Sequence, residues 1–222
     1  MKKNNIILIG FMGVGKGTVA RAMVKEVEMV GLKSHFREDG KEEVCGNGTL
    51  VPYKNKAGTE VPVPNEGNKE AGMVGIDSHF QYVIDTDDLI ESMENRAIKK
   101  IFAVEGEAYF RNLEKKTALW LESSVDNTII STGGGFYRQE NLKNIGTVIY
   151  LKSSFDGILK RIKKAPNAKN KLKKRPLLQN KKEAMKLYDT RVKEYERVAD
   201  IIVNVENIDL EFIVKEILGQ IK

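Results

Sequence analysis

The chain has few of the features that mark secreted or membrane proteins. Its 222 residues include a single cysteine, Cys45, which excludes an intramolecular disulfide and favours a reducing compartment. The longest apolar run near the start, Ile6 to Ile9, is far shorter than the roughly 20 residues that span a bilayer. Glycines at positions 10, 13 and 15 interrupt this apolar start, so we expect no signal peptide. A cytoplasmic protein without a membrane segment is therefore expected.

Charge and composition leave several functions open. The chain carries 37 Lys and Arg against 31 Asp and Glu, a net charge of +6, and 41% of its residues are hydrophobic. This composition suits one compact domain over residues 1–222. The modest positive charge is compatible with a polyanion or with a small phosphorylated ligand, and does not separate the two.

Short apolar runs alternate with segments of helical periodicity. Because parallel strands need crossover connections, five such runs predict an α/β fold with a mainly parallel five-stranded sheet flanked by helices. The expected strands are Asn5–Ile9, Tyr82–Ile84, Thr128–Ile130, Thr147–Leu151 and Ile201–Val203. The expected helices are Gly15–Met29, Ala108–Glu122, Phe155–Lys163, Lys182–Val198 and Leu210–Ile221.

Residues 31–80 do not fit this pattern. They hold 8 of the 19 glycines and 3 of the 5 prolines, without a sustained apolar period. We interpret them as an insertion between the first helix and the second strand. Thr49–Tyr53 and Thr59–Val63 are candidates for a small edge hairpin within it, and disorder is the alternative.

The strongest motif is a glycine-rich segment between the first expected strand and helix. It reads Gly10-Phe11-Met12-Gly13-Val14-Gly15-Lys16-Gly17-Thr18, which has the pattern and position of a phosphate-binding loop. Backbone N–H groups and the helix N-terminus attract phosphate oxygens, and Lys16 adds a full positive charge. A plain glycine-rich turn is the alternative. The residues predicted to contact a nucleoside triphosphate are Gly13, Val14, Gly15, Lys16, Gly17 and Thr18.

Gly17 departs from the usual motif. The residue after the lysine is usually Ser or Thr, whose hydroxyl ligates magnesium, and Gly17 has no side chain to do so. Adenylate-kinase-like proteins also show Gly-Lys-Gly-Thr and hold the metal through water. We therefore expect Asp85 to hold magnesium, through water.

Acidic residues follow the second expected strand in the sequence Asp85-Thr86-Asp87-Asp88. Ligands of open α/β sheets bind at the carboxyl ends of the strands, and strand alternation would send Asp85 and Asp87 to the same side. Asp87 could then accept a proton from an attacking hydroxyl. The alternative is that Asp87 and Asp88 cap the helix that follows.

Three consecutive glycines, Gly133, Gly134 and Gly135, follow the third expected strand. A side chain at such a position would block the close approach of a ligand, although a plain turn remains possible. Further along, Lys160 to Arg175 contains nine basic residues and no acidic one.

The whole pattern resembles the shikimate kinase family. The matching segments come in family order and cover nearly all of the chain outside residues 31–80. They are Gly10–Thr18, Asp85–Asp87, Ile101–Phe102 through Gly106–Glu107, Phe110–Arg111 to Glu114, Ser131–Gly135, Arg175–Leu178, Arg191 with Tyr195, and Ala199–Asp200. The resemblance implies a P-loop kinase fold of the nucleoside-monophosphate-kinase type and transfer of the ATP γ-phosphoryl group to the 3-hydroxyl of shikimate.

The resemblance also implies roles for individual residues. Asp87 would bind the substrate hydroxyls and act as the base, and Arg111 and Arg191 would bind the substrate carboxylate, with Gly133–Gly135 presenting backbone to the ligand. A planar guanidinium suits a carboxylate better than an ammonium does. Residues 160–182 would form a basic lid, from which Arg175 contacts ATP and the transferring phosphate.

Two other functions remain possible. The first is another small-molecule or nucleotide kinase of the same fold. The second is a nucleic-acid-binding protein that uses the lysine-rich segment, although this segment has no aromatic residue for base stacking. We expect a monomeric enzyme that binds ATP, Mg²⁺ and shikimate, without a nucleic-acid or membrane partner.

Overall fold

The chain divides into two units, residues 1–27 with 79–222 and residues 28–78. A computed structural model describes the following residues: 3–34, 80, 82–166, 168 and 176–221. The sheet and every site residue described below belong to the first unit. Most of the predicted insertion, with its candidate hairpin, lies outside the described residues.

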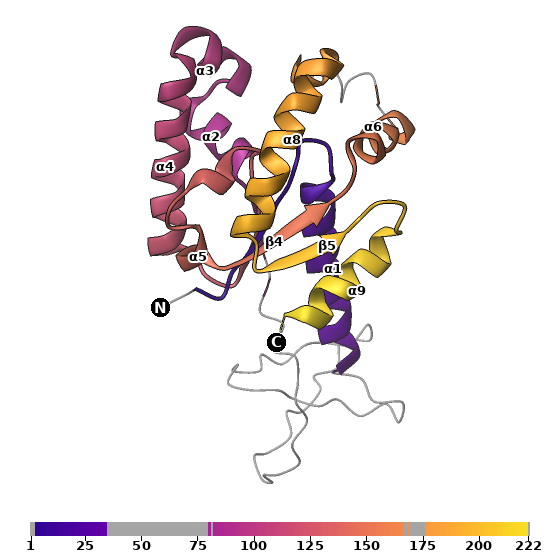
Figure 1. The fold of residues 1–222 in the computed structure, drawn as a ribbon. Helices are drawn as coiled ribbons and strands as arrows, with labels where there is room; N and C mark the ends of the chain where they lie inside the picture. The colour runs from indigo at the N-terminus through magenta and orange to yellow at the C-terminus, as the bar shows by residue number, and fades with distance from the viewer. Residues whose placement is uncertain (1–2, 35–79, 81, 167, 169–175, 222) are drawn as a thin grey trace, which may run out of the picture. The chain divides into compact units, whose positions relative to one another are not determined.

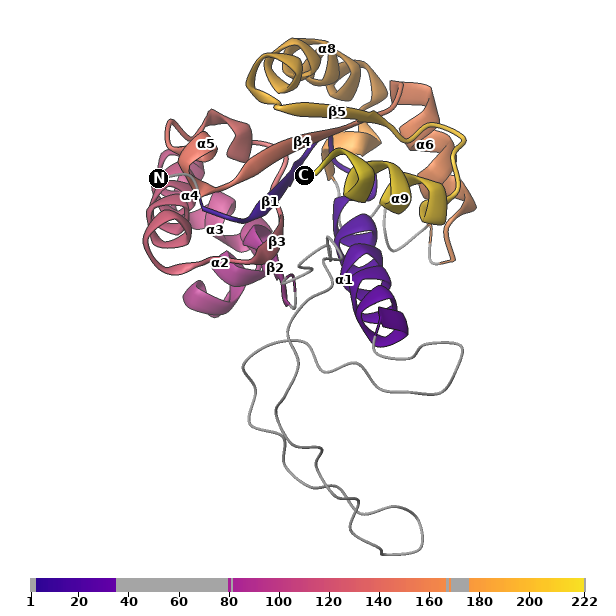
Figure 2. The ribbon, with the colours of Figure 1, turned by 90° about the horizontal axis from the view of Figure 1, so that it is seen from below.

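Five parallel strands form one sheet, with β1 at its centre (Figures 1 and 2). The strand order is β2-β3-β1-β4-β5. This confirms the predicted α/β class, and each strand lies within one or two residues of its expected range. The strands are β1 (Ile6–Ile9), β2 (Tyr82–Asp85), β3 (Thr128–Ser131), β4 (Thr147–Lys152) and β5 (Ile201–Asn204).

Helices cover both faces of the sheet: α8 lies on one face, and α1 and α9 lie on the other (Figure 2). The five longest helices correspond to the five expected ones. The α-helices are α1 (Lys16–Ser34), α2 (Thr86–Glu94), α3 (Ile98–Val104), α4 (Gly106–Ser124), α5 (Leu142–Ile145), α6 (Phe155–Lys164), α8 (Lys181–Val198) and α9 (Leu210–Gln220). Two 3₁₀ turns are η1 (Phe136–Arg138) and η2 (Pro176–Gln179).

The central strands are buried on both faces, which explains why they are continuous apolar runs rather than alternating ones. All four residues of β1 are at most 1% exposed. Ile7 pairs with Ile130 of β3 on one side and with Val148 of β4 on the other. This register brings the carboxyl ends of β1, β2 and β3 to the same edge of the sheet.

A buried asparagine joins the opposite ends of these strands. Asn5 is 2% exposed, and its amide nitrogen donates to the carbonyls of Val125 at 2.9 Å and Ile145 at 2.8 Å. Its amide oxygen accepts a hydrogen bond from the N–H of Thr128 at 3.0 Å. Asn5 therefore satisfies polar groups from three segments and supports the strand register.

Helices α3 and α5 were not predicted, and α2 was named only as the helix that follows Asp88. Helices α2, α3 and α4 share a small apolar cluster beside the main core, made of Ile90, Ile101, Phe110 and Leu113. Asn95 ends α2 in a left-handed conformation, with φ of 50°. This second cluster packs α2 against α3 and α4.

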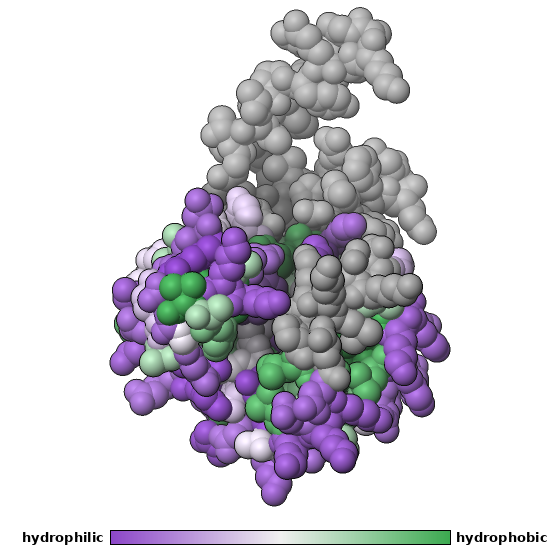
Figure 3. All heavy atoms as spheres, turned by 90° about the horizontal axis from the view of Figure 1, so that it is seen from above, coloured by the Kyte–Doolittle hydropathy of each residue, from purple (hydrophilic) through white to green (hydrophobic). Residues whose placement is uncertain are grey.

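The surface seen from above the view of Figure 1 is mainly hydrophilic, with smaller hydrophobic areas (Figure 3). No helix within the described residues is both long and apolar enough to cross a membrane.

Candidate functional site

The glycine-rich loop connects β1 to α1, as predicted. Gly13 and Gly15 have φ of 88° and 111°, a region that other residues rarely adopt. A Cβ at Gly13 would lie 2.5 Å from Cδ1 of Ile162, so the loop also packs too closely for a side chain there. The loop is thus shaped by backbone conformation and by its contact with α6.

Lys16 lies inside this loop at the start of α1. Its ammonium group donates to the carbonyl oxygens of Gly10 at 2.8 Å and Phe11 at 3.4 Å, and the residue is 9% exposed. Thr18 lies two residues further along α1, where its N–H donates to the carbonyl of Gly15 at 2.9 Å. A buried cation and a helix N-terminus therefore face the same loop, an arrangement that attracts phosphate.

Arg161 of α6 also contacts the phosphate loop. Its guanidinium donates to the carbonyl oxygen of Val14, and its Nη1 would lie 2.9 Å from a Cβ at Gly15. Arg161 belongs to the basic segment Lys160 to Arg175, in which no separate role was expected for it. No local signal identifies it, because the contact joins residues 147 positions apart.

Asp85 ends β2 and caps α2. Its Oδ1 accepts hydrogen bonds from the N–H groups of Asp87 at 3.0 Å and Asp88 at 3.5 Å, and its Oδ2 accepts from Oγ of Ser131 at 2.8 Å. The cap is therefore Asp85, and the alternative that Asp87 and Asp88 cap this helix is wrong. The strand-alternation argument for Asp87 also fails, because the helix begins at Thr86.

Asp87 lies in the first turn of α2, and its carboxylate faces the glycine turn. Burial raises the pKa of Asp87 to about 6, and the negative charge of Asp85 adds to the shift, while Lys16 partly opposes it. The positive charge of Lys16 therefore favours the ionised form of this carboxylate. A carboxylate with this pKa accepts a proton more readily than an ordinary aspartate does.

Each glycine of the triple-glycine turn contacts a different predicted site residue. A Cβ at Gly133 would collide with Oδ1 of Asp87, and a Cβ at Gly135 would collide with Nη1 of Arg111. At Gly134, the Cβ would lie 3.0 Å from Nη1 of Arg191 and 3.9 Å from the N–H nitrogen of Met12 in the phosphate loop. The turn therefore brings the three predicted substrate-binding side chains to one wall beside the loop.

Two glutamates orient Arg111. The guanidinium donates to Glu107 at 2.8 and 3.0 Å and to Glu114 at 2.6 Å. Glu114 is 1% exposed, and burial raises its pKa although Arg111 opposes the shift. Glu114 lies within a segment that matches the family, but no role was expected for it, since a charged residue at helical spacing is ordinary on a surface.

Arg191 enters the site from α8. It is 7% exposed, and its Nε is buried without a hydrogen-bond partner among the described residues. Tyr195, one turn further along, donates its hydroxyl to the carbonyl of Gly134 at 2.7 Å and fixes the turn. A buried guanidinium nitrogen without a partner suits an anionic ligand.

Part of the predicted basic lid lies outside the described residues, including Arg175. The described part of residues 160–182 contributes the end of α6, the turn η2 and the start of α8. Glu206, which follows β5, accepts hydrogen bonds from Ser154 at 2.7 and 2.8 Å. Glu206 therefore supports the N-terminus of α6.

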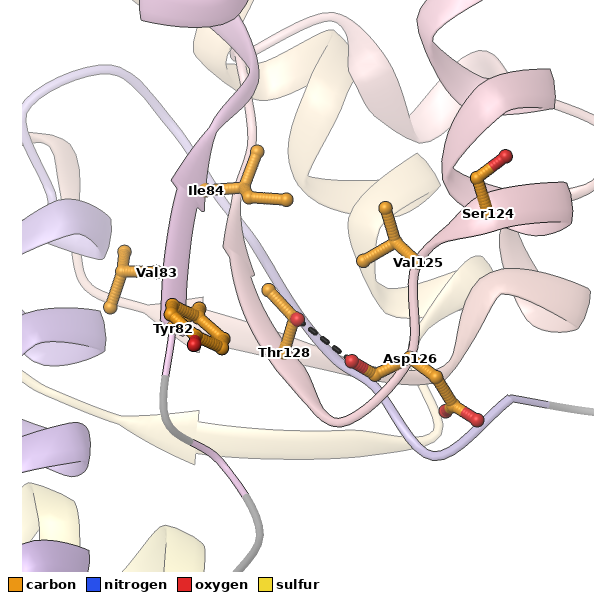
Figure 4. Close-up of a pocket in the computed structure, with 7 residues that line it drawn as sticks. All are labelled: Tyr82, Val83, Ile84, Ser124, Val125, Asp126 and Thr128. Carbon is orange, nitrogen blue, oxygen red and sulfur yellow. Dashed lines mark hydrogen bonds between the residues drawn. The ribbon is translucent and has the colours of Figure 1, made fainter.

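A separate pocket lies at the other end of β2 and β3 (Figure 4). Tyr82 and Thr128, the first residues of these strands, line it together with Asp126, whereas Asp85 and Ser131 are the last residues of the same strands. None of the predicted site residues lines this pocket.

Comparison with known proteins identifies the family. A family model described as shikimate kinase matches residues 78–222. The chain belongs to the shikimate kinase family. The shikimate kinase of Dictyoglomus turgidum is 37% identical over 144 residues, which cover 63% of this chain and 81% of the relative. That of Helicobacter hepaticus is 29% identical over 200 residues, which cover 90% of this chain and 86% of the relative.

Solved structures of shikimate kinases have the same fold. The Aquifex aeolicus enzyme is 27% identical, with a TM-score of 0.59 and coverage of 97% of this chain and 94% of that one. The Acinetobacter baumannii enzyme, solved in complex with shikimate, is 25% identical, with a TM-score of 0.64 and coverage of 99% and 93%. These findings confirm the P-loop kinase fold and a kinase of the shikimate kinase family.

The pKa of Asp87 predicts how the stability of this protein responds to Asp87→Asn. A folded-state pKa of about 6, against 3.8 for the ordinary group, means that ionised Asp87 destabilises the folded state above about pH 6. This penalty disappears as the pH falls below about 4. In metal-free buffer near pH 8 we expect Asp87→Asn to increase the free energy of unfolding by about 2–3 kcal/mol.

Chemical denaturation across this pH range measures the difference between wild type and variant. The exposed neighbour Asp88 provides the control for a substitution at the start of α2, because Asp88→Asn should change stability less than Asp87→Asn does. An Asp87→Asn difference that stays constant from about pH 4 to about pH 8 would contradict the raised pKa.

Proposed function

We propose that this shikimate kinase transfers the γ-phosphoryl group of ATP to the 3-hydroxyl of shikimate, with the residues of the triple-glycine wall as its acceptor site. The observation that supports these assignments most strongly is the meeting of Asp87, Arg111 and Arg191 at three consecutive glycines beside the phosphate loop. One carboxylate and two guanidinium groups suit an acceptor that carries both hydroxyls and a carboxylate.

ATP would bind on the loop side. The N–H groups of residues 13–18 would surround its phosphates, and Lys16 would leave the loop carbonyls to contact them. Asp85 lies beside Gly17 and supplies oxygen atoms that suit Mg²⁺, which it would hold through water. Bound Mg²⁺ would neutralise negative charge on the phosphates. Arg175 would complete the site from the basic segment.

Shikimate would bind against the glycine wall. Its carboxylate would lie between the guanidinium groups of Arg111 and Arg191, of which the second has an unsatisfied buried Nε. Glu107 and Glu114 would keep Arg111 oriented, so little side-chain freedom is lost on binding. The absence of side chains at Gly133–Gly135 lets Asp87, Arg191 and Arg111 approach the backbone of the turn, where they would surround the acid.

Asp87 would orient the 3-hydroxyl and accept its proton. The hydroxyl oxygen then forms a bond to the γ-phosphorus, while the bond between that phosphorus and the β–γ bridging oxygen breaks. The products are ADP, shikimate 3-phosphate and the proton on Asp87. Because phosphoryl transfer needs little covalent help from the protein, positioning and charge stabilisation would supply most of the rate.

We further propose a cytoplasmic monomer that needs no nucleic-acid partner. All assigned groups come from a single chain, which supports a site complete within one protomer. The single cysteine supports a reducing compartment.

An acceptor screen tests the proposed reaction. Purified enzyme with MgATP should release ADP with shikimate much faster than with gluconate, AMP or CMP, and phosphorus NMR should identify a 3-phosphate ester. Lys16→Ala serves as the control for contaminating kinases, because it removes the loop cation. Preferential phosphorylation of gluconate, AMP or CMP would contradict the assignment.

The carboxylate role of Arg111 predicts the effect of Arg111→Lys. An ammonium cannot reproduce the bidentate contact, and hydrogen bonds between charged groups contribute about 1.5–3 kcal/mol. We therefore expect KM for shikimate to rise about 10-fold to 100-fold while KM for ATP changes little, as measured by steady-state kinetics.

Arg96→Lys is the matched control for this experiment. Arg96 lies near the end of α2 and also pairs with two glutamates, Glu94 and Glu105, but it makes none of the contacts at the glycine wall. Its substitution should leave both KM values close to wild type. Equal increases of both KM values in Arg111→Lys would argue against a carboxylate contact.

A further inference from the structure

The missing side chain at Gly17 leaves an open position beside two oxygen-bearing groups. A Cβ at Gly17 would lie 3.6 Å from Oδ2 of Asp85 and 3.6 Å from Oγ of Ser131, with Nη1 of Arg21 at 3.4 Å. These are ordinary or slightly close contacts, and the φ of Gly17 is not among the positive values. Neither packing nor backbone conformation therefore requires glycine at this position.

Ser131 points its hydroxyl into this region from the end of β3. It pairs in register with Asp85 of β2, and its Oγ donates to Oδ2 of Asp85 at 2.8 Å. Because the proton of the hydroxyl is directed at the carboxylate, the oxygen lone pairs are left for another partner. Ser131 is 1% exposed, so this hydroxyl is held in place rather than free in solvent.

We propose that Ser131 replaces the absent loop hydroxyl and, with Asp85, holds the Mg²⁺ of the bound nucleotide. In the usual loop, a Ser or Thr hydroxyl after the lysine is the protein's own ligand to this ion. In this chain the hydroxyl comes from β3 and reaches the same side of the loop. Hydroxyl and carboxylate oxygens are ligands that suit Mg²⁺ and Mn²⁺.

The inference deepens the proposed function, since it concerns the metal of the same nucleotide. It also predicts that Gly17 and Ser131 are coupled: a hydroxyl is needed at one of the two positions, and either can supply it. The space at Gly17 admits a serine, because the nearest atoms to its Cβ would be 3.4 Å away or further.

Metal binding can be measured without turnover. The electron paramagnetic resonance signal of free Mn²⁺ gives the affinity of Mn²⁺ for the enzyme–ADP complex. A separate titration with ADP in EDTA gives the affinity of the enzyme for ADP in the absence of metal. Ser131→Ala should weaken Mn²⁺ binding about 10-fold to 100-fold, the range for groups that support a metal site. ADP affinity in EDTA should stay within about twofold of wild type, because Ser131 would act on the nucleotide through the metal.

Two further variants make the result specific. Gly17→Ser in the Ser131→Ala background should restore Mn²⁺ affinity to within about threefold of wild type. Thr128→Ala removes a hydroxyl from the other end of β3, where its Oγ1 donates to the carbonyl of Asp126 at 2.9 Å, and should leave Mn²⁺ affinity unchanged. Thermal unfolding of each variant controls for folding.

Two results would overturn the inference. One is wild-type Mn²⁺ affinity in Ser131→Ala. The other is a loss in Ser131→Ala that Gly17→Ser does not restore, since the loss would then come from displacement of Asp85. Either result, with shikimate turnover intact in the wild type, leaves the proposed reaction standing. A restored Mn²⁺ site in a protein that does not phosphorylate shikimate would instead contradict the proposed reaction alone.

Discussion

The close approach of charged side chains to the backbone of Gly133–Gly135 is the constraint on which this site depends. Asp87, Arg191 and Arg111 each occupy space that a side chain at one of these glycines would fill. The three groups come from α2, α8 and α4, and the turn that they meet follows β3, next to the central strand that leads into the phosphate loop. The order of the strands thus brings residues that are distant in the sequence together on one surface.

The site holds several charged groups in a buried environment. Their burial lowers the stability of the folded protein and also makes Asp87 a better proton acceptor. Burial and neighbouring carboxylates raise the pKa of Asp87 to about 6, while Glu114 stays buried against Arg111. Such groups destabilise the free protein and are poised for a ligand that brings complementary charge. The orphaned Nε of Arg191 fits the same description. These buried charged groups are therefore expected to stabilise the complex with a ligand more than they stabilise the folded protein alone.

Much of the fold could be predicted because its signals are local. Continuous apolar runs identify buried parallel strands, and the phosphate loop combines glycines, a lysine and a strand-to-helix position. Helices α3 and α5 were not predicted because they are short, with seven and four residues. Arg161, Glu114 and Ser131 were not assigned roles because their contacts arise from packing. The choice of Asp87 rested partly on strand alternation, whereas the first turn of α2 is what places its carboxylate against the triple-glycine turn.

A crystal structure of the enzyme with shikimate and ADP tests the central claim most directly. The account predicts that the substrate carboxylate contacts both Arg111 and Arg191, and that the 3-hydroxyl lies within hydrogen-bond distance of Asp87 on the side that faces the phosphate loop. Shikimate bound with its carboxylate away from both arginines, or with the 3-hydroxyl turned away from Asp87, would contradict it.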